Sequence, residues 1–180
     1  MQVGLEFTVQ TSEFVEHEGE GLLPVQIAAN NALGKAREVA GRTTTRGLVL
    51  GADTIVVCRG QVLGKPKDRD DARRMLGLLS GRWHDVLTAI ALVDAVDGHA
   101  ETDVVNTRVH MRTLVDDELD NYLSSGEPFD KAGAYGIQGL AAQFVDCIDG
   151  CYFNVVGLPL SRTMELIRRM TAKPQYTTPT

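Results

Sequence analysis

The chain has 180 residues, of which 43% are hydrophobic and 23% are charged, as is ordinary for one globular domain with its own core. Its formal net charge of −6 and the lack of a basic stripe argue against a protein that binds duplex nucleic acid. A small polyanionic substrate still fits this charge, because a few lysines focused in a cleft can outweigh the global balance.

The sequence predicts a cytoplasmic protein that binds neither membrane nor nucleic acid. No apolar run approaches the roughly 20 residues of a membrane-spanning helix, and the first residues show neither the basic nor the apolar region of a signal peptide. The chain has an odd number of cysteines, Cys58, Cys147 and Cys151. Cys147 and Cys151 lack the second ligand pair of a zinc site. Reduced thiols are therefore expected.

The first half of the chain predicts two helices around a buried strand. Pro24 suits the first turn of a helix over residues 24–40. The inward residues expected on this helix are Val25, Ala28, Ala29, Ala32, Leu33, Ala36 and Val39. The apolar run from Gly47 to Asp53 predicts a strand, which TIVVC extends. Asp68 is the expected N-cap of a second helix. Its expected inward residues are Ala72, Met75, Leu76 and Leu79.

The second half predicts two long strands and two more helices. Residues 84–93 and 102–112 have strand patterns, and the second alternates cleanly between apolar and polar positions. The acidic run 116–120 opens a helix, residues 159–170 form the last one, and the polar tail 171–180 is expected to be frayed. This alternation of helix and strand predicts an α/β domain with a mixed sheet.

The first candidate site combines the Gly-Ala-Asp53-Thr54 and Gly-Lys65-Pro66 motifs. A carboxylate at the end of an apolar strand lies where open α/β sheets bind ligands. Pro66 disfavours helix at the residue before it, so Lys65 is expected to project from a loop. Taken alone, each motif also has a structural interpretation, because Asp, Gly and Pro are all common in turns.

A second candidate lies in the segment SGEPFDKAGAYGIQG, residues 125–139. Its glycines and alanines allow the backbone to approach a ligand closely. Lys131 and Gln138 supply a cation and an amide, which suit a phosphate and the edge of a base. An ordinary surface loop is an equally good interpretation of the segment by itself.

Arg82 and His84 are a third pair with two interpretations. Both side chains can contact phosphate, but the pair follows a Ser-Gly turn between a predicted helix and a predicted strand. The structural role, fixing that helix–strand corner, is favoured. The sequence has no Walker-type phosphate loop, HExxH or GxSxG motif.

Taken together, these stretches resemble the Maf family of nucleotide pyrophosphatases. The matching segments are GADTIVV, LGKPKD, MLGLLSGRWHDVLT, SGEPFDKAGAYGIQG and NVVGLPL, with an AxxKA helix motif that ends in Lys35-Ala36. They occur in the family's order between residues 7 and about 168. The resemblance implies one two-lobed α/β domain over residues 1–170, built around a long mixed sheet with the active site in a cleft.

The resemblance also implies catalytic roles. Asp53 would accept the proton of the attacking water, and Lys35 and Lys65 would neutralise phosphate charge. Glu16 and Asp53 would hold a divalent cation, Mg²⁺ or Mn²⁺, although the family's usual Asp-Glu pair is here Val15-Glu16.

Substrate recognition is implied for three further positions. Thr54 and Gln138 match positions that tune base specificity, and Lys131 would contact the substrate. The GIQG ending resembles the branch of the family that acts on dTTP and UTP. The expected partner is thus a nucleoside triphosphate, and assembly as a homodimer is left open.

One departure from the family leaves the activity open. Family members begin with a strand and an SxSPRR phosphate-binding loop upstream of the Phe7 equivalent, and only six residues precede Phe7 here. We therefore expect this sequence to lack that segment. The main alternative function is a catalytically impaired nucleotide-binding or cell-division regulatory protein. A phosphatase or kinase is a third hypothesis, which the lack of a phosphate-loop motif disfavours.

Overall fold

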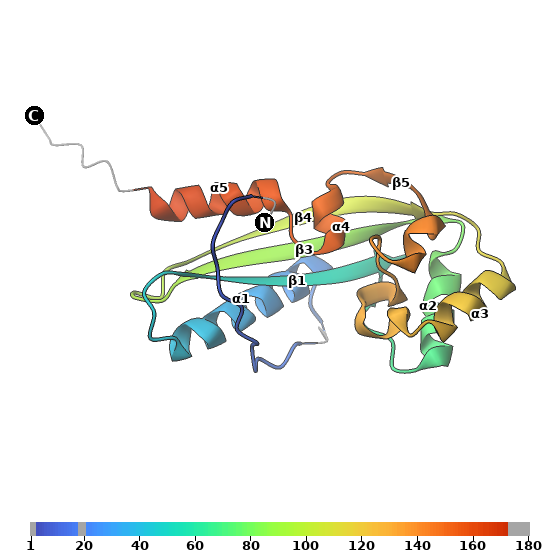
Figure 1. Ribbon diagram of the computed structural model, residues 1–180, viewed down its shortest axis with the longest axis horizontal. Coiled ribbons are helices and arrows are strands. Elements are labelled where there is room, and N and C mark those ends of the chain that lie inside the picture. The colour runs from blue at the N-terminus through green and yellow to red at the C-terminus, as the bar shows by residue number, and fades with distance from the viewer. Residues whose placement is uncertain (1–2, 18–20, 173–180) are drawn as a thin grey trace, which may run out of the picture.

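The computed structural model describes residues 3–17 and 21–172 and centres on a five-stranded sheet of order β2-β1-β3-β4-β5 (Figure 1). The strands are β1 (Leu48–Cys58), β2 (Gln61–Leu63), β3 (Arg82–Asp94), β4 (Ala100–Met111) and β5 (Val145–Asp149). The α/β class is confirmed, but every neighbouring pair in the described sheet is antiparallel, so the expected mixed sheet is wrong for these residues. Tight turns, such as Arg59-Gly60 with positive φ at both positions, join β1 to β2 as a hairpin and impose that direction.

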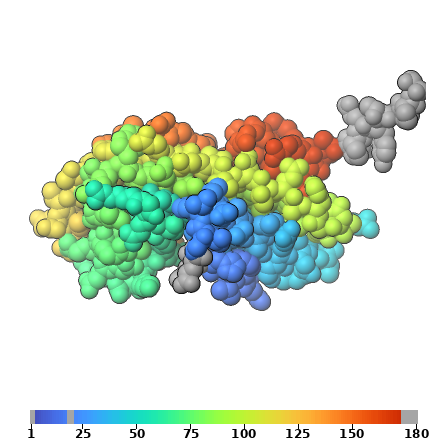
Figure 2. Space-filling view, turned by 180° about the vertical axis from the view of Figure 1, so that it is seen from behind, coloured from blue at the N-terminus to red at the C-terminus, as the bar shows by residue number. Residues whose placement is uncertain are grey.

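The helices form two groups, one toward each end of the long strands. They are α1 (Pro24–Arg42), α2 (Arg69–Leu79), α3 (Asp116–Ser124), α4 (Tyr152–Val156) and α5 (Leu160–Thr171), with 3₁₀ turns at Glu127–Asp130, Ala132–Ala134 and Leu140–Phe144. In Figure 1, α1 and α5 cover opposite faces of one half of the sheet, and α2 and α3 lie beyond its other half. From behind, the blue atoms of α1 and the green atoms of α2 lie toward opposite ends (Figure 2). Within the described residues, no helix is long and apolar enough to cross a membrane.

The predicted elements are confirmed within a few residues, with local corrections. Asp68 caps α2 by accepting a hydrogen bond from Asp71 N at 2.8 Å. Val25 is 41% exposed and not inward, because the helix buries its neighbour Ile27 instead. Thr171 still belongs to α5, and the remainder of the predicted tail from residue 173 lies outside the described residues.

The alanine-rich face of α1 allows this helix to lie very close to β1. Ala28, Ala32 and Ala36 are almost fully buried against the sheet. The closest approach is at Gly51, where a Cβ atom would overlap the Ala32 carbonyl oxygen and lie 2.9 Å from Ala36 N. A bare backbone at residue 51 is therefore a condition for this packing.

A buried polar pair joins β3 to Tyr135, the residue that follows the 3₁₀ turn Ala132–Ala134. His84 Nε2 on β3 lies 2.6 Å from the Tyr135 hydroxyl, and the two residues are only 2% and 5% exposed. Burial lowers the pKa of His84 to about 4 and raises that of Tyr135. Arg82 donates to Leu78 O at 3.0 Å, so the structural interpretation of Arg82 and His84 is confirmed.

The first prediction concerns Gly51. Gly51→Ala should lower the free energy of unfolding by about 1–3 kcal/mol, because the new methyl group must push α1 away from the sheet. Urea denaturation measures this change. Gly77→Ala is the matched control, since Gly77 lies in α2 with open space around it and alanine there should stabilise the helix by up to about 1 kcal/mol. Equal stability of Gly51→Ala and the wild type would contradict the close packing.

The second prediction concerns acid stability. The folded pKa of His84 lies below its unfolded value, so the unfolded state binds more protons and stability falls as pH drops from about 6.5 to about 4. His84 should account for about 3 kcal/mol of that loss. His84→Gln should therefore flatten the pH dependence of the unfolding free energy in this window. The exposed His99→Gln serves as the control. Identical slopes in both variants would rule out a buried neutral His84.

Candidate functional site

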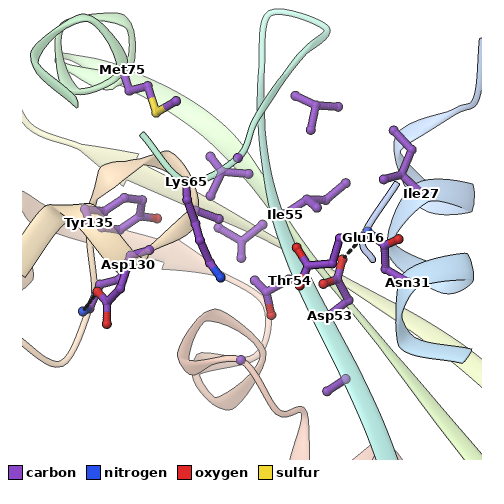
Figure 3. A pocket seen from close by; sticks show the side chains of 18 of the residues that line it. Glu16, Ile27, Asn31, Asp53, Thr54, Ile55, Lys65, Met75, Asp130 and Tyr135 are labelled. Carbon is purple, nitrogen blue, oxygen red and sulfur yellow. Dashed lines mark hydrogen bonds and ion pairs between the residues drawn. The ribbon is translucent and has the colours of Figure 1, made fainter. Parts of the chain in front are cut away.

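A cleft of about 790 Å³ opens along the edge of β1. Helix α1 lies on one side of it, and residues 130–137, which include the 3₁₀ turn Ala132–Ala134, lie on the other. Strand β2 covers this edge only from Val56 to Cys58, so the upstream part of β1 borders the cleft. Six of the predicted site residues line it: Glu16, Lys35, Asp53, Thr54, Lys65 and Lys131. In Figure 3, Glu16, Asn31 and Asp53 gather on one side and Lys65, Asp130 and Tyr135 on the other.

The N-terminal segment runs along α1 and brings Glu16 to the cleft. The Phe14 ring lies directly on Gly34, where a Cβ atom would overlap the ring. The backbone N–H of His17 donates to Asn31 Oδ1 at 2.9 Å. These two contacts flank Glu16 and hold it over the helix surface that carries Asn31.

The ammonium group of Lys35 joins three segments of the chain. Its Nζ lies 2.6 Å from Asp53 Oδ1 on β1 and 2.6 Å from Glu16 Oε1 in the N-terminal segment. Asn31, one helical turn before Lys35, donates to Asp53 Oδ2 at 3.3 Å. Asp53 is only 7% exposed, so its charge requires these partners.

The charges in this group stabilise one another. Burial alone would lower the pKa of Lys35, but its hydrogen bonds to Asp53 and Glu16 outweigh burial and raise it. The hydrogen bond from Lys35 holds the pKa of Glu16 below its usual range. Both shifts favour the charged forms of Lys35 and Glu16.

The donor set of Glu16 and Asp53 fits a hard divalent cation. Mg²⁺ is usually held by one or two carboxylates and completes its shell with water and substrate phosphates. Within residues 3–17 and 21–172 no cluster of three or more His, Cys, Asp or Glu side chains could hold a metal ion by itself. Lys35 shows that positive charge is accommodated between these two carboxylates.

On the opposite wall, Lys131 and Lys65 differ in their electrostatic state. Lys131 Nζ lies 2.6 Å from Asp130 Oδ1, so a carboxylate already neutralises its charge. Lys65 makes no ion pair with any residue that the structure describes, and its side chain points into the cleft (Figure 3). The Gly133 N–H donates to Gly64 O at 3.0 Å and so links the loop that carries Lys65 to the loop that carries Lys131. Lys65 is thus available to an anionic ligand, as is Lys67, which also lines the cleft and makes no ion pair with the described residues.

Gln138 is the predicted site residue that the structure does not bring to the cleft. It is exposed, and the turn closed by the hydrogen bond from Gly139 N to Gly136 O carries it away from the lining residues. Conversely, sequence reasoning missed Asn31 and Tyr135. Asn31 had a detectable signal, because it is an amide on the mostly apolar face of α1, one turn before Lys35.

Comparison with known proteins finds several relatives that are named dTTP/UTP pyrophosphatases. The chain is 50% identical over 167 residues to a dTTP/UTP pyrophosphatase of Syntrophomonas wolfei, covering 93% of this chain and 88% of that protein. It is 47% identical over 173 residues to the dTTP/UTP pyrophosphatase of Acetivibrio thermocellus, covering 93% and 86%. It is 49% identical over 166 residues to that of Moorella thermoacetica, covering 92% and 85%.

The family model described as Maf-like protein matches residues 1–170, which include both walls of the cleft and the α1 helix that carries Lys35. By this match and by its relatives, the chain belongs to the Maf family.

Proposed function

We propose that this chain hydrolyses dTTP and UTP, each to the nucleoside monophosphate and pyrophosphate. The observation that carries the proposal is the cleft in which Lys35 lies between Glu16 and Asp53. The relatives that share this segment of sequence are named dTTP/UTP pyrophosphatases. A cleft with two lysines, Lys65 and Lys67, that make no ion pair with the described carboxylates suits a ligand that carries several negative charges.

The triphosphate binds by charge. Lys65 meets the phosphates first, because it makes no ion pair with the described carboxylates. Lys131 can exchange Asp130 for a phosphate oxygen, since Asp130 is an exposed partner. Phosphoryl transfer leaves a protein mainly positioning and electrostatic stabilisation to provide, and lysines beside the leaving group provide both.

Asp53 is the proton acceptor. The rigid position of Asp53 in β1 aims its carboxylate at the cleft. A water molecule beside Asp53 loses a proton to this carboxylate as the water oxygen attacks the α-phosphorus. The new P–O bond forms as the bridging P–O bond breaks, and the electron pair leaves with pyrophosphate. Lys65 stabilises the charge on that leaving group.

Glu16 and Asp53 would hold the divalent cation, Mg²⁺ or Mn²⁺. When bound, it would neutralise phosphate charge and make an adjacent water more acidic. Lys35 would then hold the two carboxylates together between catalytic cycles.

The third prediction is a substrate screen. Pyrophosphate release should be faster from dTTP and UTP than from CTP, ATP, GTP or methylated GTP, because the hydroxyl of Thr54 suits the edge of uracil or thymine. The screen should include this chain and the same chain preceded by the SxSPRR segment of a relative. Tight binding without pyrophosphate release in both proteins would favour the regulatory alternative. Orthophosphate as the first product would indicate a phosphatase, and a preference for methylated GTP would overturn the base assignment.

The fourth prediction concerns Asp53→Asn, which keeps the side-chain shape and removes the charge. Turnover should fall by about two orders of magnitude or more, the order expected for loss of a general base. Nucleotide affinity should persist, because the lysines remain. Pyrophosphate release and nucleotide affinity should be measured on the same purified protein.

Asp130→Asn is the matched control for Asp53→Asn. It removes a carboxylate from the same cleft, but that carboxylate is exposed and its one ion pair among the described residues is with Lys131. Its turnover should stay within a few-fold of the wild type, as is usual for surface ion pairs. Normal turnover in Asp53→Asn, or an equal loss in both variants, would remove Asp53 from the role of base.

A further inference from the structure

A chain of hydrogen bonds leads from the cleft into the core on the face of β1 opposite Asp53. Thr54 follows Asp53 in β1, so its side chain points to the other face of the sheet. Thr54 Oγ1 lies 2.9 Å from Thr88 Oγ1, directly across on β3. Thr88 Oγ1 lies 2.8 Å from the backbone carbonyl oxygen of Asn154 in α4. Thr88 and Asn154 are fully buried, and only Thr54 reaches the cleft.

The chemistry of the three groups fixes the direction of both hydrogen bonds. A carbonyl oxygen can only accept, so the Thr88 hydroxyl donates its one hydrogen to Asn154 O. Thr88 then has only lone pairs for Thr54, and Thr54 must be the donor in that contact. The Thr54 hydroxyl therefore donates its one hydrogen to Thr88 inside the protein. Toward the cleft it presents lone pairs alone.

Further hydrogen bonds hold Asn154, the inner end of this chain of hydrogen bonds, in place. The Asn154 side chain donates from Nδ2 to Val86 O at 2.9 Å, and Gly157 N donates to the same Asn154 carbonyl at 3.0 Å. If Thr88 donated to Thr54 instead, the oxygens of Thr88 and Asn154 would face each other at 2.8 Å with no hydrogen between them, which is costly for two buried acceptors. Gly157 also keeps the approach to Thr54 open, because a Cβ atom there would lie 3.6 Å from Thr54 Oγ1.

We propose that Thr88 is a positioning residue that locks Thr54 as a hydrogen-bond acceptor and so selects a base with an imide N–H, as in uracil and thymine. The inference rests on the proposed function and adds the source of base selectivity to it. A phosphate oxygen at this point would face only lone pairs, so the hydroxyl serves the base and not the triphosphate. Cytosine is disfavoured for the same reason, because its N3 is an acceptor where uracil N3 carries a hydrogen.

The fifth prediction tests Thr88→Val. This change removes the acceptor for Thr54, whose hydroxyl is then free to donate into the cleft. The selectivity for UTP over CTP should fall about tenfold, the order of one neutral hydrogen bond. The measurements are kcat/KM for pyrophosphate release from each nucleotide and the affinity for α,β-methylene analogues of UTP and CTP. The affinity ratio tests the chain of hydrogen bonds even if no turnover occurs, so failure of the proposed function is seen separately.

Two variants separate the chain of hydrogen bonds from a general effect on the fold. Thr88→Ser keeps the hydroxyl and should restore the wild-type selectivity. Thr107→Val is the matched control, because Thr107 is an equally buried threonine on β4 that donates to Cys151 O at 3.2 Å and lies outside the cleft lining. It should lose stability and keep the selectivity.

Thr54→Val provides the same test if Thr88→Val does not fold. It removes the acceptor itself and should abolish the preference for UTP over CTP. An unchanged UTP-to-CTP affinity ratio in Thr88→Val, or in Thr54→Val, would overturn the proposal. An equal loss of affinity for both nucleotides would also overturn it, because the hydroxyl would then contact the sugar or only support the fold.

Discussion

The close contact between α1 and β1 is the constraint on which the site depends. At Gly51 the helix backbone touches the strand without an intervening side chain, and two residues later on the same face of the strand lies Asp53. Lys35 lies between Ala32 and Ala36, the two helix residues that meet Gly51. The short distance between helix and strand therefore sets the 2.6 Å contact between Lys35 Nζ and Asp53 Oδ1.

The ammonium group of Lys35 pairs with two carboxylates, which stabilises the site and still allows a ligand to compete for these groups. The buried carboxylate of Asp53 needs a cation, while Glu16 is half exposed and comes from a segment held to α1 by a few contacts. An incoming cation or phosphate can compete for these partners at the exposed side first. The arrangement thus gives the buried Asp53 a partner without closing the cleft to a ligand.

Alternation along β1 gives its two faces different chemistry. Asp53 points toward α1 and the ionic group, and Thr54 points toward Thr88 and α4. A substrate that lies along the edge of this strand would present its phosphates to charge and its base to a neutral acceptor. Among the described residues no strand pairs with that edge of β1, and this allows both faces to reach one cleft.

The sequence by itself determined the long elements and the ionic residues. Hydrophobic periodicity located α1, α2, α5 and the long strands, because each is long enough to show its period. Motif resemblance pointed to Lys35, Asp53 and Lys65, whose chemistry is evident from residue type. Strand direction, the turn that carries Gln138 out of the cleft and the contact between Thr54 and Thr88 were decided only by the tertiary structure. These features depend on register and on pairings between residues far apart in the chain, which local pattern cannot specify.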